Sequence, residues 1–384
     1  MKVYVVIGNK SGVDLHRLIL PHVELKKQEP DWEIAFGYVD IEEIGKYDIV
    51  IFNRIINKEK FEELKTKYPH VKVVMDLDDY WQLDQNHIMA EQYKELGISE
   101  LIQSLIPRVD LVITTSPILA NKIKPLNSNV KILPNALNPE LEFEPKPTQS
   151  SLIRLGMIGG ISHYTDVDLL TGVVNSLPQK VKDKVQFVLC GFDKTVDEKG
   201  NILDWRLNKW NHLEQILSDN YNLVSKSHYL ELMQYHRIDV DPKEHYRRIW
   251  SRDIFNYGTM YNDIDILLVP LKDTNFNRCK SELKLVEASV MGKAAIVSDV
   301  YPYKFCGINA IEHGGTINLD GNCIMVDERK GAKGWAKAIT KMVEDEEFRN
   351  MTVENLKKLT ETKYNLSEVT KHRREIYDEL VGNN

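Results

Sequence analysis

The chain has 384 residues, of which 42% are hydrophobic and 28% are charged, and its formal net charge is -7 at pH 7. This length allows two domains with separate cores, and the composition is that of a soluble globular protein. The negative net charge does not favour general binding to nucleic acid. The four cysteines are scattered and form no Cys-x-x-Cys pair, which disfavours a zinc site and is consistent with a reducing cytosol.

The first residues predict a strand rather than a signal peptide. A short apolar run at 3–7 follows Met1 and Lys2 directly. Because this run is far too short to span a bilayer, we expect a cytoplasmic protein whose membrane contact is at most peripheral, at the inner face.

Strands and helices alternate along the first third of the chain. A glycine loop at 8–12 separates the first strand from a predicted helix at 13–20, as in nucleotide-binding α/β units, although plain turn glycines explain it equally well. Its spacing is not that of the dinucleotide fingerprint. Further strands are predicted at 48–52, 71–75, 111–115 and 130–133, with helices at 58–67 and 99–106. This order predicts an α/β fold with a parallel sheet and functional loops at its carboxyl edge.

Three carboxylates follow the predicted strand at 71–75, namely Asp76, Asp78 and Asp79. An Asp-x-Asp pair can hold Mg²⁺ or Mn²⁺ through oxygen atoms. A cluster of like charges also raises one pKa, which suits acid/base chemistry or the binding of hydroxyl groups. A third interpretation is that Asp78 or Asp79 caps the next helix. The position at the carboxyl edge of the sheet favours the second interpretation and leaves the other two open.

A polar segment with two prolines at 142–151 predicts a linker, and we place the domain boundary near residue 146. A second α/β unit follows, with a strand at 152–157 and a helix at 166–177 that Asp166 would cap. The aromatic, irregular segment at 193–250 is interpreted as an insertion.

Gly159 and Gly160 form the loop between this strand and helix. They would let the backbone approach a phosphate at the helix start, although a simple turn is an equally good explanation. His163 could donate to a phosphate or sugar oxygen, but a lone histidine is more often structural.

The stretch 276–303 predicts a loop, a helix from about Ser281 to Gly292, and a buried strand at 294–297. Lys280, Lys284 and Glu287 share one face of this helix. Two lysines beside a helix N-terminus make an anion site, because the free amides and the helix dipole add to their charge. The alternative is that Lys284 and Glu287 form an ordinary solvated pair.

The two units, the Pro-rich linker and a terminal helix resemble the GT-B glycosyltransferases, specifically the retaining nucleotide-sugar enzymes of glycosyltransferase family four. The matching motifs are Ser11-Gly12-Val13-Asp14, the segments 110–116 and 132–135, and above all 280–298. The resemblance covers most of the chain except 193–250. It implies two Rossmann-like domains that face a central cleft, at 1–145 and 146–359, with a C-terminal helix at about 360–384 that returns to the first domain.

The resemblance also implies roles for individual residues. Glu287 matches the glutamate that holds the ribose hydroxyls, and the loop around Gly12 would face the donor phosphates. The first glutamate of the family's motif would stand at position 279, where this chain has Cys279. The Arg and Lys that commonly follow the second glycine loop are also missing.

Other residues are expected to replace these charges. The resemblance implies that Lys280 supplies the charge for the pyrophosphate, with Lys284 or Arg278, and that Ser281 lies at the phosphates. Asp78 and Asp79 occupy about the place where the family often has a histidine near the sugar.

We therefore expect a retaining hexosyltransferase that uses a nucleoside-diphosphate sugar and a glycan or other hydroxyl acceptor, without metal or further cofactor. Polysaccharide or glycoconjugate synthesis is the expected setting. The alternatives are a nucleotide-sugar 2-epimerase of the same fold and a non-catalytic protein that binds nucleotide sugars or glycans.

Overall fold

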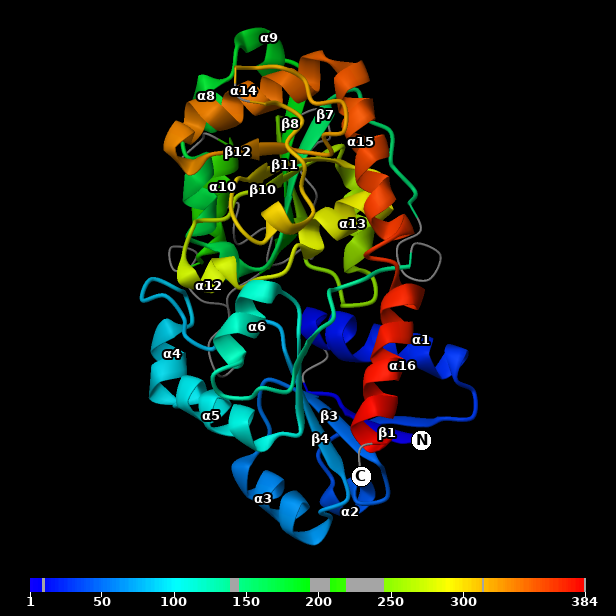
Figure 1. Cartoon of the computed structure of the whole chain (residues 1–384). Coiled ribbons are helices and arrows are strands. Elements are labelled where there is room, and N and C mark those ends of the chain that lie inside the picture. Colours follow the sequence, from blue (N-terminus) through cyan, green and yellow to red (C-terminus); the bar gives the residue numbers. More distant parts are fainter. Residues whose placement is uncertain (9–10, 139–144, 194–207, 219–244, 313, 383–384) are drawn as a thin grey trace.

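The computed structural model describes residues 1–8, 11–138, 145–193, 208–218, 245–312 and 314–382, and all structural statements concern these residues. Figure 1 shows two α/β halves, one above the other, with the first sheet in the lower half and the second sheet in the upper half. Both chain ends lie in the lower half, because the C-terminal helix returns to it (Figure 1).

The first sheet has six parallel strands in the order β2-β1-β3-β4-β5-β6. Its strands are β1 (Lys2–Val6), β2 (Glu33–Gly37), β3 (Ile49–Asn53), β4 (Lys72–Leu77), β5 (Leu111–Thr114) and β6 (Val130–Ile132). Helices on both faces bury the central strands, which explains their continuous apolar sequences. The helices of this half are the π-helix η1 (Asp14–Ile19), α1 (Leu20–Gln28), α2 (Ile41–Ile44), α3 (Lys58–Lys67), α4 (Ala90–Glu95), α5 (Ile98–Leu105), the 3₁₀ turn η2 (Ile106–Arg108) and α6 (Pro117–Ile123).

The second sheet also has six parallel strands, in the order β12-β11-β10-β7-β8-β9. Its strands are β7 (Ile153–Ile158), β8 (Val185–Phe192), β9 (Tyr246–Trp250), β10 (Ile266–Val269), β11 (Ala294–Ser298) and β12 (Ile324–Val326). Its α-helices are α8 (Val173–Ser176), α9 (Gln179–Lys182), α10 (Trp210–Ser218), α12 (Asn275–Arg278), α13 (Leu283–Met291), α14 (Gly331–Glu344) and α15 (Glu346–Glu361). The 3₁₀ turns are η3 (Ile161–His163), η4 (Asp166–Leu170), η6 (Tyr257–Asp263), η7 (Tyr303–Phe305) and η8 (Glu328–Lys330). The two parallel sheets confirm the predicted α/β fold.

The chain passes between the halves at two points that lie side by side. The Leu137 amide donates to the Tyr364 carbonyl at 3.2 Å, and the Leu366 amide donates to the Leu137 carbonyl at 3.3 Å. Beyond this crossing, α16 (Leu366–Gly382) packs on α1 of the first half. A hydrogen bond of 2.9 Å between His22 and Tyr377 joins the two helices. The predicted return of the C-terminal helix is therefore confirmed.

Two local predictions were wrong, and two strands were missed. The predicted helix at 166–177 is instead η4 followed by α8, since Gly172 adopts a left-handed φ of 77° between them. Asp166 does not cap it; its side chain bonds to residues of another segment. The predicted strands omitted β2 and β9.

The insertion interpretation of 193–250 does not hold for the described parts of that range. Helix α10 contributes buried Trp210, Leu213 and Leu217 to the core of the second half, and β9 is a strand of its sheet. The remainder, 194–207 and 219–244, lies outside the described residues. Among the described helices, none is both long and apolar enough to cross a membrane.

Candidate functional site

Ser11 and Asp14, at the end of the first glycine loop, are joined by two reciprocal hydrogen bonds. The Ser11 hydroxyl accepts from the Asp14 amide, and the Asp14 carboxylate accepts from the Ser11 amide, each at 3.2 Å. This is the capping-box arrangement, and it starts the helix that carries the next buried side chains. Among the described residues, a Cβ added to Gly12 would meet no atom within 4 Å, so this position leaves room for a ligand.

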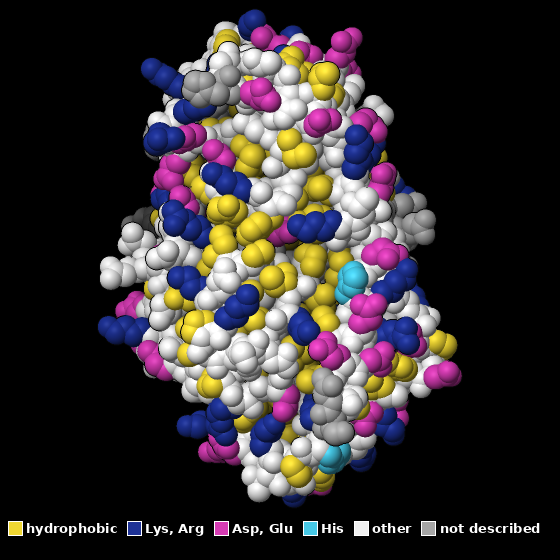
Figure 2. All heavy atoms as spheres, viewed as in Figure 1, with side chains coloured by type: hydrophobic (Ala, Val, Ile, Leu, Met, Phe, Trp, Pro, Cys, Tyr) yellow, Lys and Arg dark blue, Asp and Glu magenta, His cyan; other side chains and the backbone are white. Residues whose placement is uncertain are grey.

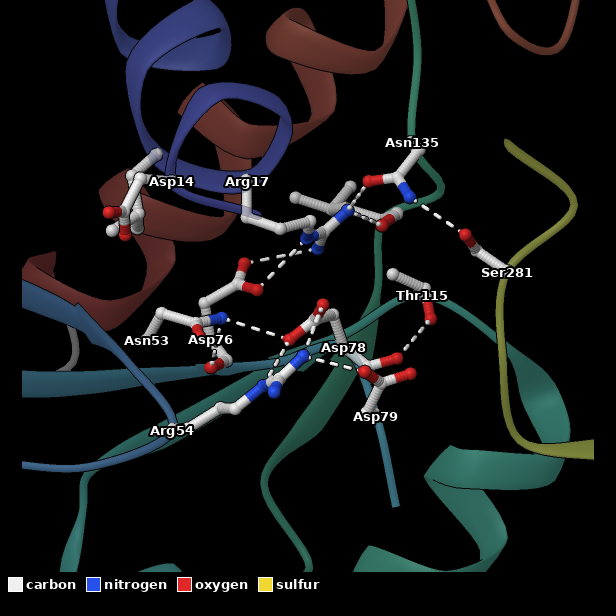
Figure 3. A network of polar contacts seen from close by, with 12 residues as sticks. Asp14, Arg17, Asn53, Arg54, Asp76, Asp78, Asp79, Thr115, Asn135 and Ser281 are labelled. Carbon is white, nitrogen blue, oxygen red and sulfur yellow. Dashed lines mark hydrogen bonds and ion pairs between the residues drawn. The ribbon is translucent and has the colours of Figure 1, made fainter. Parts of the chain in front are cut away.

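Helix η1 directs Arg17 into the first half, where it is 1% exposed (Figure 3). A π-helical turn of this kind is frequent at functional sites. Arg17 forms two hydrogen bonds with the Asp76 carboxylate, at 2.9 and 3.0 Å, and a third with Asn135 at 3.0 Å. The Asn135 amide in turn donates to the Ser281 hydroxyl at 2.8 Å. A continuous polar chain therefore joins the first sheet to the loop before α13 in the second half (Figure 3).

Asp78 and Asp79 converge on one guanidinium, that of Arg54 (Figure 3). Arg54 bonds to Asp78 at 2.9 and 3.0 Å and to Asp79 at 2.6 Å. Burial opposes ionisation of Asp78, but the Arg54 charge outweighs it and lowers the pKa to about 2. Arg54 has a φ of 57°, a strained conformation for a residue with a side chain, and such strain is concentrated at functional sites.

The structure distinguishes between the three interpretations of the aspartates, namely helix capping, metal binding and acid/base or hydroxyl binding. Asp78 and Asp79 do not cap a helix, because the next one, α4, begins only at Ala90. Within the described parts of the chain, no group of three or more His, Cys, Asp or Glu side chains could hold a metal ion. Both carboxylates accept hydrogen bonds from one cation, an arrangement that suits the binding of hydroxyl groups.

The second glycine loop is a close-packed corner. A Cβ added to Gly159 would come within 3.0 Å of the His163 ring, and one at Gly191 within 2.7 Å of the Gly159 carbonyl. His163 Nδ1 lies 2.9 Å from Asp166 Oδ2, so the histidine is held by its own loop. Gly160 has more room, since the nearest atom to an added Cβ is 3.8 Å away.

Asp166 connects this loop to the stretch that precedes α13. It is 3% exposed and accepts hydrogen bonds from the Lys272 amide and the Asn277 side chain, each at 3.0 Å. Burial opposes its ionisation, but the His163 contact, the Lys272 amide and the charge of Lys280 hold its pKa below the ordinary value. The glycine loop and residues 272–277 are thus fixed as one unit.

Lys280 lies where the two halves meet. Its ammonium is 3.8 Å from Asp79 of the first half and 4.6 Å from the centre of the Phe276 ring. The side chain is 20% exposed, so it is partly desolvated and still open to a ligand. The ring of His87, from the first half, packs edge-on against Phe276 at 5.1 Å.

Cys279 lies in the core of the first half although its chain segment belongs to the second. It is fully buried, its carbonyl accepts a hydrogen bond from the Ser116 hydroxyl at 3.2 Å, and burial raises the pKa of its thiol to about 11. Cys279, which the resemblance aligns with a glutamate, is therefore a buried packing contact between the halves and is not accessible to a sugar hydroxyl.

Glu287 is buried within α13, where its carboxylate accepts three hydrogen bonds. Tyr257 donates to Oε1 at 2.6 Å, while Tyr261 and Lys284 donate to Oε2 at 2.5 and 2.7 Å. Burial opposes ionisation, but Lys284 and these donors keep the pKa below its ordinary value. His16 of the first half lies 3.8 Å from Oε1. Since Glu287 is 1% exposed, its pairing with Lys284 is not the ordinary solvated pair that the sequence allowed.

Arg278 lies apart from these groups, 48% exposed and paired with Asp273 at 2.5 and 2.8 Å. It lines a cavity of about 410 Å³ that side chains of both halves enclose, among them Lys122, Tyr301 and Lys304. Figure 2 shows hydrophobic side chains gathered where the halves meet, with Lys and Arg beside them. A larger cavity of about 680 Å³ lies beside β12. None of the predicted site residues lines it, so we do not assign the donor site to this cavity.

The structure thus brings together most of the residues selected from the sequence. Lys280, Ser281, Asp78 and Asp79 meet where the halves join, and Asp166 ties the loop of Gly159 and Gly160 to the same segment. Arg278 lies apart from them, and Lys284 and Glu287 form a second cluster with Tyr257 and His16. Several site residues were missed: His16, Arg17, Arg54, His87, Tyr257 and Tyr261. Arg54 follows the end of β3, so the strand-end rule could have found it, whereas nothing in the local sequence marks His87.

Several solved structures share this fold. Sucrose-phosphate synthase from Thermosynechococcus elongatus superimposes with a TM-score of 0.65 at 12% identity, with 100% of both chains covered. HepE from Anabaena, in complex with UDP and glucose, gives 0.63 at 12% identity over 99% of this chain and 100% of that one. WaaG, a glycosyltransferase involved in lipopolysaccharide biosynthesis, gives 0.55 at 11% identity over the whole of both chains. The chain therefore has the GT-B fold.

No protein-family model matches the sequence, and no curated protein matches it significantly. At 11–12% identity, the structural likeness shows the fold and leaves the activity to be argued from the site.

Proposed function

We propose that the chain transfers a hexose from a nucleoside-diphosphate sugar to an acceptor hydroxyl, with retention of configuration, in polysaccharide or glycoconjugate synthesis. The observation that carries the proposal is the meeting of Lys280 and Ser281, directly before α13, with Asp79 and Asn135 of the other half. Cationic, amide and hydroxyl donors converge there from two sheets, beside a carboxylate that can accept from sugar hydroxyls.

The diphosphate of the donor would lie at the start of α13. The free amides of this nine-residue helix and its dipole attract an anion, and Lys280 adds a full charge. The loop of Gly159 and Gly160, held to the same segment through Asp166, would approach the diphosphate from the second sheet. HepE, which has this fold, was solved with UDP and with UDP-glucose.

Glu287 would bind the ribose hydroxyls, provided that one of its present hydrogen-bond donors is displaced. A carboxylate offers about four lone-pair positions, and three are occupied by Tyr257, Tyr261 and Lys284. A ribose diol that donates two hydrogen bonds must therefore displace one of these donors. We propose that Lys284, 21% exposed, turns from Glu287 towards the diphosphate when the donor binds.

In the chemical step, the main task of these residues is to stabilise the leaving diphosphate. The bond between the anomeric carbon and the diphosphate oxygen breaks, a bond to the acceptor oxygen forms on the same face, and the acceptor proton passes to the leaving phosphate. Lys280 and the α13 amides stabilise the charge that develops on the diphosphate, so they act on the transition state more than on the ground state. Because the lysines supply this charge, we propose that the reaction needs neither a metal nor a further cofactor.

The two halves would enclose the donor and keep water from hydrolysing it. The Arg54-held pair of Asp78 and Asp79 faces Lys280 across the boundary, where the donor sugar would lie. These carboxylates would accept hydrogen bonds from sugar hydroxyls.

Calorimetry with UDP and GDP, followed by product analysis with UDP- and GDP-hexoses, tests the proposal. We expect one nucleotide to bind, and NMR of the product to show the anomeric configuration of the donor. Inverted product would refute retention. Sugar epimerised without any acceptor would indicate a 2-epimerase, and binding without transfer or slow hydrolysis would indicate a non-catalytic binding protein. A wild-type protein that binds neither nucleotide would overturn the proposal.

A further inference from the structure

Two buried histidines lie six residues apart in the first helical segment, and each meets a tyrosine from a distant part of the chain. His22 Nε2 lies 2.9 Å from the Tyr377 hydroxyl, and its Nδ1 lies 2.6 Å from the Leu18 carbonyl. His16 Nε2 lies 2.5 Å from the Tyr257 hydroxyl. The first contact joins two helices of one half, whereas the second crosses from the first half to the second.

The hydroxyl of Tyr257 connects His16 to Glu287. The Tyr257 hydroxyl donates to Glu287 Oε1 at 2.6 Å, and the imidazole lies 3.8 Å from the same oxygen. The side chains of His16 and Glu287 are only 4% and 2% exposed, so water does not compete for these bonds. The rings of His16 and Tyr257 meet edge to face, with centres 5.8 Å apart.

The direction of these bonds follows from the chemistry of the groups. The carboxylate is an acceptor only, so Tyr257 gives its single proton to Glu287 and its oxygen must accept from His16. The imidazole is neutral, since burial lowers its pKa to about 4. Its one proton therefore sits on Nε2. Within the described structure Nδ1, which is buried, has no hydrogen-bond partner, so the ring is held through Nε2.

We propose that His16 is a positioning residue of the nucleotide site, which acts through Tyr257 to hold the Glu287 carboxylate in the orientation that receives the ribose. This inference rests on the proposed function and adds a residue of the opposite half to the donor site. When the halves separate, Tyr257 loses the N–H donor that aims its hydroxyl. Docking of the first half therefore completes a site that lies in the second.

Two substitutions of His16 distinguish the role of its Nε2 atom from that of its Nδ1 atom. Gln places an amide N–H near the position of Nε2, so His16→Gln keeps a donor to Tyr257. Asn reaches only the position of Nδ1, so His16→Asn removes that donor. Tyr257→Phe deletes the hydroxyl and keeps the ring. If the His16 substitutions prevent folding, this variant still provides a folded protein for the test. The same pair of substitutions at His22, with Tyr377→Phe, is the matched control for loss of a buried histidine–tyrosine contact.

The measurement is UDP and GDP affinity by calorimetry, with the thermal midpoint recorded for every variant. We expect His16→Asn and Tyr257→Phe each to weaken nucleotide binding about 10-fold, the equivalent of one hydrogen bond. The double variant should be no weaker than the worse single one, because both remove the same connection. His16→Gln should bind within about 2-fold of wild type, and the His22 and Tyr377 variants should lose stability without losing affinity.

Unchanged affinity in His16→Asn and Tyr257→Phe would overturn the inference while leaving the proposed function intact. Equal losses in His16→Gln and His16→Asn would also overturn it, since the Nε2 donor would then be irrelevant. Wild-type protein that binds neither nucleotide would overturn both, so the two failures are distinguishable.

Discussion

The ammonium of Lys280 lies 3.8 Å from the Asp79 carboxylate, and the two residues belong to opposite halves of the molecule. The distance is at the long end of the ion-pair range, and the Asp79 carboxylate is already bonded to Arg54 at 2.6 Å. Among the residues that the structure describes, no acidic group lies closer to the Lys280 ammonium, so its charge is not neutralised by a close partner. This is the arrangement expected of a cation that must accept an anionic ligand.

Lys280→Ala should therefore lower turnover by about 10²- to 10³-fold, as the loss of one preorganised donor at a developing charge does in other enzymes. Initial rates at saturating donor, with circular dichroism to check folding, measure this. Lys65→Ala is the matched control, because Lys65 is also a partly buried lysine, paired with Asp110 at 3.0 Å away from the site. Near-normal turnover in Lys280→Ala would remove Lys280 from the phosphate role.

Arg54→Ala should destabilise the first half by about 2–4 kcal/mol, because it leaves the largely buried Asp78 and Asp79 as a like-charge pair that the ammonium of Lys280, 3.8 Å from Asp79, offsets only in part. Relief of the strained backbone at position 54 will offset only a small part. Urea unfolding measures the loss. Adding Asp78→Asn to the variant should restore part of the stability, since it removes one of the uncompensated charges. A double variant that is additively worse would contradict this account of the ion pairs.

Removal of metal ions should leave transfer activity unchanged, because lysines and helix amides supply the charge at the leaving group in the proposed mechanism. The assay compares initial rates with and without EDTA at fixed donor concentration, after extensive dialysis. Activity that disappears in EDTA and returns with Mn²⁺ would revive the acidic loop at 76–79 as a metal site.

Acidification should destabilise the protein through His16. Burial sets its pKa at about 4 in the folded protein, against 6.5 in the unfolded chain. Between these values only the unfolded chain binds the proton, so stability falls as the pH drops from about 6.5 to 4. Burial also lowers the pKa of His22 well below its ordinary value, and this histidine adds a loss of the same sign.

His16→Gln removes one of these contributions. The variant should therefore lose less stability over the same window than wild type does, by at most about 3 kcal/mol. Urea unfolding at several pH values measures the difference. Stability curves for variant and wild type that run parallel from pH 7 to pH 4 would show that His16 titrates normally.

Local patterns predicted much of the secondary structure. The helix at 58–67 and the strand from Ala294 coincide with α3 and β11, and Gly292 ends α13 with a φ of 61° as expected. Strand β9 was missed because two adjacent arginines interrupt the apolar residues of Tyr-Arg-Arg-Ile-Trp, which therefore shows no buried pattern. Those arginines are accommodated by partners elsewhere, as Arg248 is by Glu214 at 2.6 Å.

The sequence predicted individual residues of the candidate site but not the hydrogen bonds and ion pairs that join them. Carboxylates at a strand end and lysines before a helix are features of adjacent residues, so the sequence marks them. The cation that holds Asp78 lies 24 positions earlier, and the partner of Ser281 lies 146 positions earlier. Only the fold brings such groups within hydrogen-bond distance.

By itself the sequence determined the alternation of strands and helices, the glycine loops and the helix with a basic start, because these depend on neighbouring side chains and backbone preferences. The tertiary structure alone decided that Cys279 is buried against the other half, that Arg278 turns away, and that His16 reaches Glu287 through Tyr257. These outcomes depend on which surfaces of the two halves meet, and contacts between residues hundreds of positions apart leave no periodicity in the sequence.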